Sequence, residues 1–170
     1  MTIAIISLVA ILLMMLAELW LSRANERWMF AHGAEARPDP VYATMRWAYP
    51  GAFIAMAIEG VIANPAIGQW TVAGGALLVL AKAIKFWAIG ALGRRWTYRV
   101  LVLPGASLVS GGPYRFVRHP NYIGVVGELI AMALLSGARI AGVIAVLGFG
   151  WLLVRRIRAE ERALAVSART

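Results

Sequence analysis

The sequence contains no cysteine, and among its 170 residues it has only two histidines and two lysines. Without cysteine the chain has no disulfide framework, no thiolate metal site and no thiol nucleophile. Charge is also scarce, at 15% of residues against 61% hydrophobic residues. A soluble domain carries roughly 45–50% apolar and about 25% charged residues, and one of this size has no room to bury the surplus. The composition excludes a soluble globular domain, a disordered chain and a fibrous repeat, and it predicts a small polytopic membrane protein.

The chain contains five apolar runs that are candidates for membrane spans, since a span needs about 20 mostly apolar residues. The runs cover residues 3–21, 47–63, 70–92, 122–135 and 138–154. Because every backbone polar group in lipid must bond within its own segment, we expect these runs to be helices. So few residues separate the last two that they should form a tight helical hairpin. The first run lacks the basic flank and cleavage site of a signal peptide.

Arginine is concentrated on one side of this predicted topology. Fourteen arginines fall in the segments 22–46, 93–121 and 155–170, and one, Arg139, falls on the other side. The positive-inside rule then predicts an outside N-terminus and a cytoplasmic C-terminus in a plasma or inner membrane. Arginines between apolar runs favour anionic lipid headgroups as partners, and we expect no nucleic acid because no folded reading element accompanies them. Without an internal repeat, residues 1–170 form one predicted domain.

Five charged residues fall within the predicted spans, where charge is costly and usually faces a bundle interior or a polar cavity. Glu18 and Lys85 are close enough to span ends for their side chains to reach the interface. Lys82 and Lys85 are candidates to pair with Glu59 across the bundle. Glu128 lies six residues into a short span, so we expect it to face a functional cavity, with an interhelical polar contact as the alternative.

Two segments on the predicted cytoplasmic side carry the residues suited to chemistry. The first reads G-G-P-Y-R-F-V-R-H-P-N-Y-I-G over residues 111–124, and the second reads R-R-I-R-A-E-E-R-A-L over residues 155–164. The helical hairpin should bring both to the same membrane face. Each alone has a simpler interpretation as a lipid-contacting segment, but an acidic pair beneath an anionic bilayer works against lipid binding.

Three strings in these segments match one family: G-P-Y-R at residues 112–115, R-H-P-x-Y-x-G at 118–124 and E-E at 160–161. Together they resemble the isoprenylcysteine carboxyl methyltransferase family and the related phospholipid methyltransferases. The N-terminal part of the chain, with Glu18, Arg23, Asn25 and Glu26, is similar to small bacterial members, some of which methylate alkylpyrones. The resemblance implies S-adenosylmethionine as the methyl donor, bound at the cytosolic face between the His-Pro loop and the C-terminal helix. The donor-site residues implied in this way are His119, Pro120, Tyr122, Gly124, Glu160 and Glu161.

The residue inventory fits methyl transfer from a sulfonium, which needs positioning and electrostatics but neither a metal nor a covalent nucleophile. Glu160 and Glu161 can accept hydrogen bonds from ribose hydroxyls or from the donor's ammonium, while His119 and Arg118 can hold the donor's carboxylate. With two histidines and no cysteine, we expect no metal site. The residues predicted to take part in catalysis are Arg156, as the clamp of an acceptor anion, Glu161 and Glu128.

These observations predict an all-α membrane enzyme that O-methylates a lipophilic acceptor entering from the bilayer. An isoprenylcysteine-type carboxylate and an alkylpyrone hydroxyl both fit, and both ionise without a strong base. One alternative is N-methylation of a phospholipid amine, whose rate should rise with pH because an ammonium must lose its proton. Another is a non-enzymatic bundle, either a small transporter using Glu128 and Lys82 or an interaction subunit.

Overall fold

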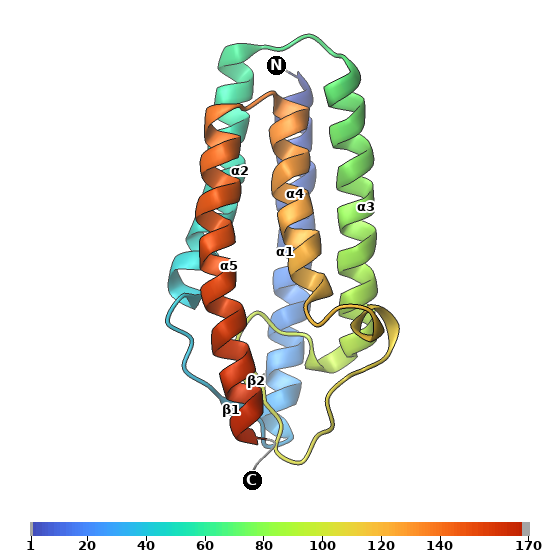
Figure 1. The fold of residues 1–170 in the computed structure, drawn as a ribbon, viewed down its shortest axis with the longest axis vertical. Helices are drawn as coiled ribbons and strands as arrows, with labels where there is room; N and C mark the ends of the chain where they lie inside the picture. Colours follow the sequence, from blue (N-terminus) through green and yellow to red (C-terminus); the bar gives the residue numbers. More distant parts are fainter. Residues whose placement is uncertain (1, 168–170) are drawn as a thin grey trace.

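The computed structural model describes residues 2–167 of the chain and shows an all-α molecule (Figure 1). Over this range the helices are α1 (Thr2–Ala31), α2 (Tyr42–Ala63), α3 (Gln69–Leu92), α4 (Pro120–Ser136) and α5 (Ile140–Ser167). The connections contain the short 3-10 helices η1 (Gly93–Arg95) and η2 (Gly112–Arg115) and the two-residue strands β1 (Glu35–Ala36) and β2 (Leu101–Val102). Each of the predicted apolar runs lies within, or nearly within, one helix, which confirms the all-α class.

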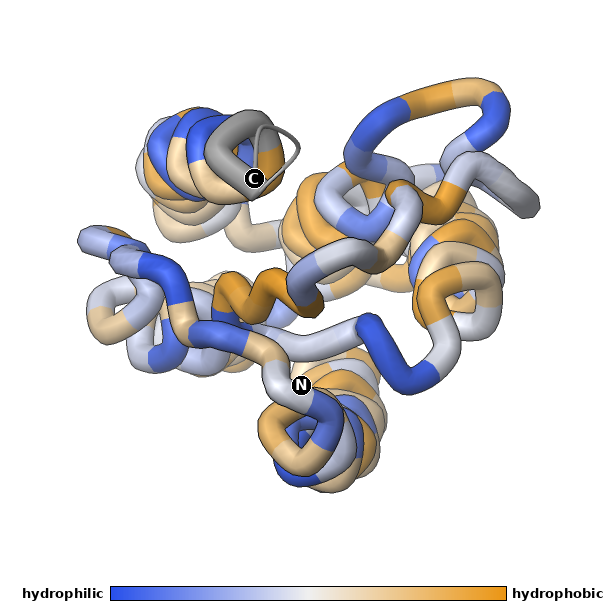
Figure 2. The backbone as a smooth tube through the Cα atoms, turned by 90° about the horizontal axis from the view of Figure 1, so that it is seen from below, coloured by the Kyte–Doolittle hydropathy of each residue, from blue (hydrophilic) through white to orange (hydrophobic). Residues whose placement is uncertain are grey.

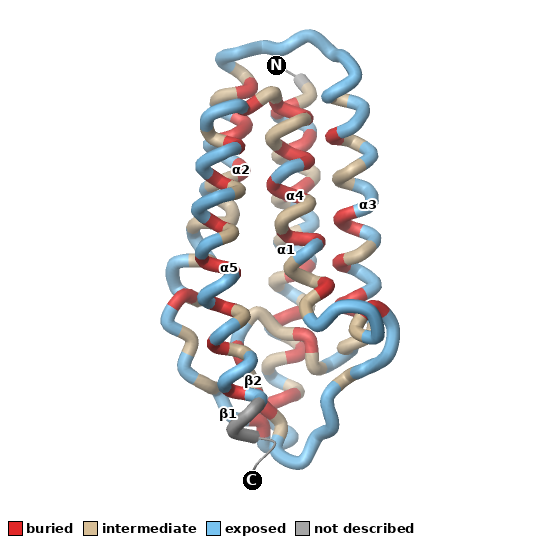
Figure 3. Tube along the Cα trace, in the orientation of Figure 1, coloured by how far each residue is buried: buried red, intermediate tan, exposed pale blue. Residues whose placement is uncertain are grey.

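The bundle has the surface of a membrane protein. Within the described chain, three helical segments are long and apolar enough to cross a bilayer, Ile3–Ala31, Gln69–Arg95 and Ile140–Leu164, and α4 is a shorter apolar helix beside them. Buried and exposed positions alternate along the helices (Figure 3). The exposed positions include Trp47, Val79 and Leu147, each about 70% exposed. Water would disfavour such a surface, whereas lipid accommodates it.

Small residues bring α3 and α4 close together. A Cβ atom built on Gly124 would lie 2.9 Å from the Cβ of Lys85, and one built on Gly74 would lie 2.9 Å from the Cβ of Leu134. Close backbone approach of this kind is how helices pack in lipid, where apolar burial gives no driving force. Gly137, in the left-handed region at φ 68°, ends α4 and turns the chain into α5. The predicted tight hairpin is therefore present.

The α2 carboxylate Glu59 caps the first turn of α5. Its two oxygens accept hydrogen bonds from the backbone N–H groups of Ile140, at 3.0 Å, and Ala141, at 2.6 Å. The first N–H groups of a helix have no partner within the helix, so a carboxylate satisfies them and complements the helix dipole. The expected pairing of Glu59 with the α3 lysines is wrong, because this carboxylate is used at α5.

The two long connections meet at the end of the bundle opposite the N-terminus (Figure 1). Strands β1 and β2 pair antiparallel, with Glu35 opposite Val102 and Ala36 opposite Leu101. The N–H of Arg37 also donates to the carbonyl of Val100, at 2.9 Å. Seen from this end, hydrophilic stretches are concentrated in the connections and in the last turns of α5 (Figure 2).

Candidate functional site

Two glutamates and two lysines form a buried ion cluster inside the bundle: Glu18 of α1, Lys82 and Lys85 of α3, and Glu128 of α4. Each lysine Nζ contacts both carboxylates, at distances between 2.7 and 3.1 Å. No side chain in the cluster is more than 7% exposed. Isolated charges are very costly to bury, and this arrangement offsets the cost because the two positive and two negative charges cancel.

The ion cluster corrects the sequence-based picture of these charges. Glu18 and Lys85 do not reach the interface, since both are buried and ion-paired. Glu128 is fully buried and makes the interhelical polar contact that was the alternative to a functional cavity. Its catalytic role stays a prediction, and this placement does not favour it. Sequence alone could not pair these residues, because the partners come from three different helices.

Two tyrosines from different parts of the chain donate hydrogen bonds to the ion cluster. The Tyr49 hydroxyl of α2 donates to Glu128 Oε2 at 2.9 Å, and the Tyr98 hydroxyl donates to Glu18 Oε2 at 3.1 Å. Tyr98 lies in the connection after η1, and its backbone N–H donates to Ser22 Oγ at 2.8 Å. Burial, and next the Glu18 carboxylate, raises the pKa of Tyr98 well above its ordinary value. The phenol therefore stays protonated and acts as a hydrogen-bond donor.

His119, Tyr122, Glu160 and Glu161 come together in what we call the His-Glu cluster. His119 Nδ1 lies 3.7 Å from Glu160 Oε2, and His119 Nε2 lies 3.4 Å from Glu161 Oε1. The Tyr122 hydroxyl donates to Glu160 Oε1 at 2.7 Å. His119 is the residue immediately before α4, Pro120 is the first residue of that helix, and the two glutamates lie near the end of α5. Segments about forty residues apart in sequence thus share one site.

Arg156 of α5 is buried and joins this cluster to the two long connections at this end of the bundle. Its Nε lies 3.3 Å from both Glu160 Oε1 and the Tyr122 hydroxyl. One terminal nitrogen donates to the Tyr98 carbonyl at 2.6 Å, and the other forms an ion pair with Asp39. An acceptor anion would have to displace these contacts, so they favour a holding role over the anion clamp predicted from sequence. No local pattern in the sequence pointed to Asp39 or Tyr98 as partners.

The remaining predicted residues occupy different surroundings. The Arg118 side chain is 88% exposed and lies 3.8 Å from Glu161, so it is free to swing toward a ligand. Pro120 and Gly124 are buried, and Gly124 packs against α3, which gives it a role in helix packing beside the cluster. In the same turn of α4, the buried Asn121 Oδ1 has no hydrogen-bond donor within residues 2–167.

The His-Glu cluster keeps groups available for a ligand. The side chains of His119 and Glu160 are about one quarter exposed, and that of Glu161 is 46% exposed. Carboxylates, an imidazole and an exposed arginine suit a zwitterionic ligand with hydroxyl groups. Burial, and next Glu160, raises the pKa of Tyr114, so this neighbour also stays a neutral phenol. The described residues contain no group of three or more potential metal ligands.

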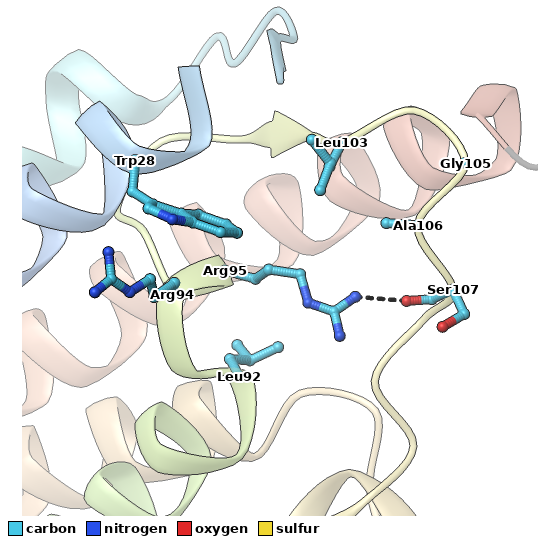
Figure 4. Close-up of a pocket in the computed structure, with 8 residues that line it drawn as sticks. All are labelled: Trp28, Leu92, Arg94, Arg95, Leu103, Gly105, Ala106 and Ser107. Atoms are coloured by element: carbon cyan, nitrogen blue, oxygen red, sulfur yellow. Dashed lines mark hydrogen bonds between the residues drawn. The ribbon is translucent and has the colours of Figure 1, made fainter. Parts of the chain in front are cut away.

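A separate hollow of about 550 Å³ lies between the end of α1, η1 and the following connection (Figure 4). Arg95 donates to the Ser107 carbonyl at 2.6 Å, while the Arg94 guanidinium lies 5.7 Å from the ring centroid of Trp28. The two guanidinium groups point to opposite sides (Figure 4). One anion therefore does not meet both, and no residue predicted for the donor site lines this hollow.

Comparison with known proteins identifies the family of this chain. The sequence model of the isoprenylcysteine carboxyl methyltransferase family matches residues 74–166, which is more than half of the chain. An uncharacterized protein of Bacillus subtilis, YpbQ, is 31% identical over 158 residues, covering 92% of this chain and 94% of its own. An uncharacterized protein of Haemophilus influenzae is 27% identical over 160 residues, covering 94% and 93%. No solved structure matches the chain. The protein therefore belongs to the isoprenylcysteine carboxyl methyltransferase family and is, at that level, a membrane methyltransferase.

Proposed function

We propose that this protein transfers a methyl group from S-adenosylmethionine to an oxygen atom of a lipophilic acceptor. The observation that carries this proposal is the His-Glu cluster, in which His119 faces Glu160 and Glu161 at the boundary between the bundle and its long connections. Bound there, S-adenosylmethionine would supply an electrophilic methyl group on a sulfonium. The chain's own task is then to hold donor and acceptor in line, which is the larger part of catalysis in such a displacement.

The cluster supplies complementary groups for the ribose and for the amino-acid part of the donor. Glu160 and Glu161 would accept hydrogen bonds from ribose hydroxyls or from the α-ammonium. His119 and the exposed Arg118 would hold the α-carboxylate. The Tyr122 hydroxyl donates a hydrogen bond to Glu160, which orients that carboxylate.

The acceptor is proposed to reach this cluster from the lipid. Ile123 beside Tyr122 and Val154 beside Arg155 are exposed apolar residues on α4 and α5, so a hydrocarbon chain can approach along them while the donor arrives from water. An acidic acceptor, such as a prenylcysteine carboxylate or a pyrone hydroxyl, is already ionised near neutral pH and needs no strong base. Because arginine is concentrated at this end, the positive-inside rule predicts that the site faces the cytosol.

The proposal is tested by calorimetric titration of the detergent-solubilised protein with S-adenosylmethionine. We expect His119→Ala and Glu161→Ala each to weaken binding by about tenfold or more, since each removes a charge-assisted hydrogen bond. The matched control is His32→Ala, because His32 stacks on Trp28 at 4.0 Å and takes no part in the His-Glu cluster. The proposal fails if the wild type does not bind, or if all three variants bind like the wild type.

A further inference from the structure

We propose that the polar face of α1, formed by Glu18, Ser22 and Asn25, positions the methyl-donor site through Tyr98 and Arg156. This inference rests on the function proposed above. The family model begins at residue 74, so nothing in that match assigns a role to α1. These three residues would act as positioning residues, through Tyr98 and Arg156, since none of them contacts the His-Glu cluster directly.

The first step is the attachment of α1 to the connection that follows α3. Glu18, Ser22 and Asn25 are spaced four and three residues apart, so they lie on one side of the helix, and all three are buried. Asn25 Nδ2 donates to the carbonyls of Gly93, at 3.2 Å, and Trp96, at 2.8 Å. With the two bonds from Tyr98 to Ser22 and Glu18, four hydrogen bonds fix residues 93–98 against α1.

The second step runs from Tyr98 to the donor site. Held at its N–H and its hydroxyl, Tyr98 presents its carbonyl to the Arg156 guanidinium at 2.6 Å. Arg156 is 4% exposed, and its Nε contacts both Glu160 and Tyr122. A shift of the Tyr98 carbonyl therefore moves Arg156, and with it the carboxylate of Glu160.

The third step is the attachment of Glu18 to the buried ion cluster. Glu18 is held by Lys82 at 3.0 Å and by Lys85 at 2.7 Å, so the hydroxyl bond from Tyr98 ends on a carboxylate fixed by the buried ion cluster. Networks of buried, mutually satisfied polar groups are rigid. A binding site whose groups are already ordered binds more tightly, because less conformational entropy is lost when the ligand arrives.

The chain offers a matched pair of variants for testing this connection. Tyr98→Phe and Tyr49→Phe each remove one tyrosine hydroxyl that donates to a carboxylate of the ion cluster. The Tyr98 carbonyl also accepts a hydrogen bond from Arg156. The Tyr49 ring packs on Phe53 and Phe149, and the hydroxyl of Tyr49 donates to Glu128, not to a residue of the His-Glu cluster. A purely structural role predicts the same effect from both substitutions, and a positioning role predicts different effects.

The experiment measures S-adenosylmethionine affinity by calorimetry and unfolding temperature for both variants in the same detergent. We expect Tyr98→Phe to weaken donor binding by about three- to tenfold, Tyr49→Phe to leave it within twofold of the wild type, and both to lower the unfolding temperature. Ser22→Ala, which releases the Tyr98 N–H, should weaken binding in the same direction and decides the question if Tyr98→Phe does not fold. Equal effects on affinity in the two tyrosine variants, or none in either, would overturn the inference while leaving the proposed function intact. Absence of binding by the wild type would instead remove the function on which it rests.

Discussion

At the scale of single residues, the ion cluster makes a charge-balance prediction. Lys82→Met leaves two glutamates facing only Lys85, and an uncompensated buried charge costs about 3–5 kcal/mol of unfolding free energy. Adding Glu128→Gln restores balance between Glu18 and Lys85, so we expect the double variant to recover a large part of that loss. Denaturant unfolding of the purified protein measures both. If the two losses simply add, the charges are not coupled and the cluster does not act as a unit.

The residues that bear the chemistry could be predicted from sequence far better than the residues that hold them. His119, Tyr122 and the glutamate pair stand in short strings that resemble a family, and the structure brings them together. Asp39, Tyr98 and Ser22 stand in no such string, because their partners are defined only when distant segments meet. The partner predicted for Lys82 and Lys85 is wrong for the same reason. A charge in an apolar run indicates burial, but it does not indicate which helix carries the counter-ion.

At the scale of elements, the cap that α2 provides for α5 yields a second stability prediction. Glu59→Ala leaves the N–H groups of Ile140 and Ala141 without this acceptor, and we expect a loss of about 0.5–2 kcal/mol in the free energy of unfolding. Donor affinity should not change, since the His-Glu cluster is near the other end of α5. Glu35→Ala is the control, because its pair with Arg37 is exposed and such pairs contribute about 0–1 kcal/mol. Equal destabilisation by the two variants would contradict the capping role.

Helix existence followed from hydropathy, whereas helix length did not. The first apolar run ends at residue 21, yet α1 continues to Ala31, because residues 23–30 include no helix breaker and the chain turns only near Gly33, at φ 83°. Likewise α5 continues past residue 154 as far as Ser167. Hydropathy marks the part of a helix that can lie within the lipid. The end of the helix depends instead on residues that interrupt it, such as glycine and proline. The extra turns matter, since they carry Asn25 and both glutamates of the His-Glu cluster.

At the scale of the whole molecule, the fold separates two routes of approach. Large apolar residues are exposed on every one of the five α-helices, and the polar connections, paired through β1 and β2, gather at one end. The His-Glu cluster sits where these two surfaces meet. The water-soluble donor and the lipid-soluble acceptor of the proposed reaction would have no common solvent, so a site at this boundary would let each stay in its own medium until they react.

This arrangement serves a cytosolic donor only if the end of the bundle that carries the two long connections faces the cytoplasm. Because the sequence has no cysteine, single introduced cysteines can measure that orientation directly. Single cysteines at Ala66, between α2 and α3, and at Ser110, before η2, occupy exposed positions at opposite ends of the bundle. The arginine asymmetry predicts that a membrane-impermeant maleimide labels Ala66→Cys on intact cells and labels Ser110→Cys only after lysis. The wild-type chain gives no background, since it has no thiol. Labelling of Ser110→Cys on intact cells would place the His-Glu cluster outside, away from intracellular S-adenosylmethionine, and would contradict the proposed function together with the topology.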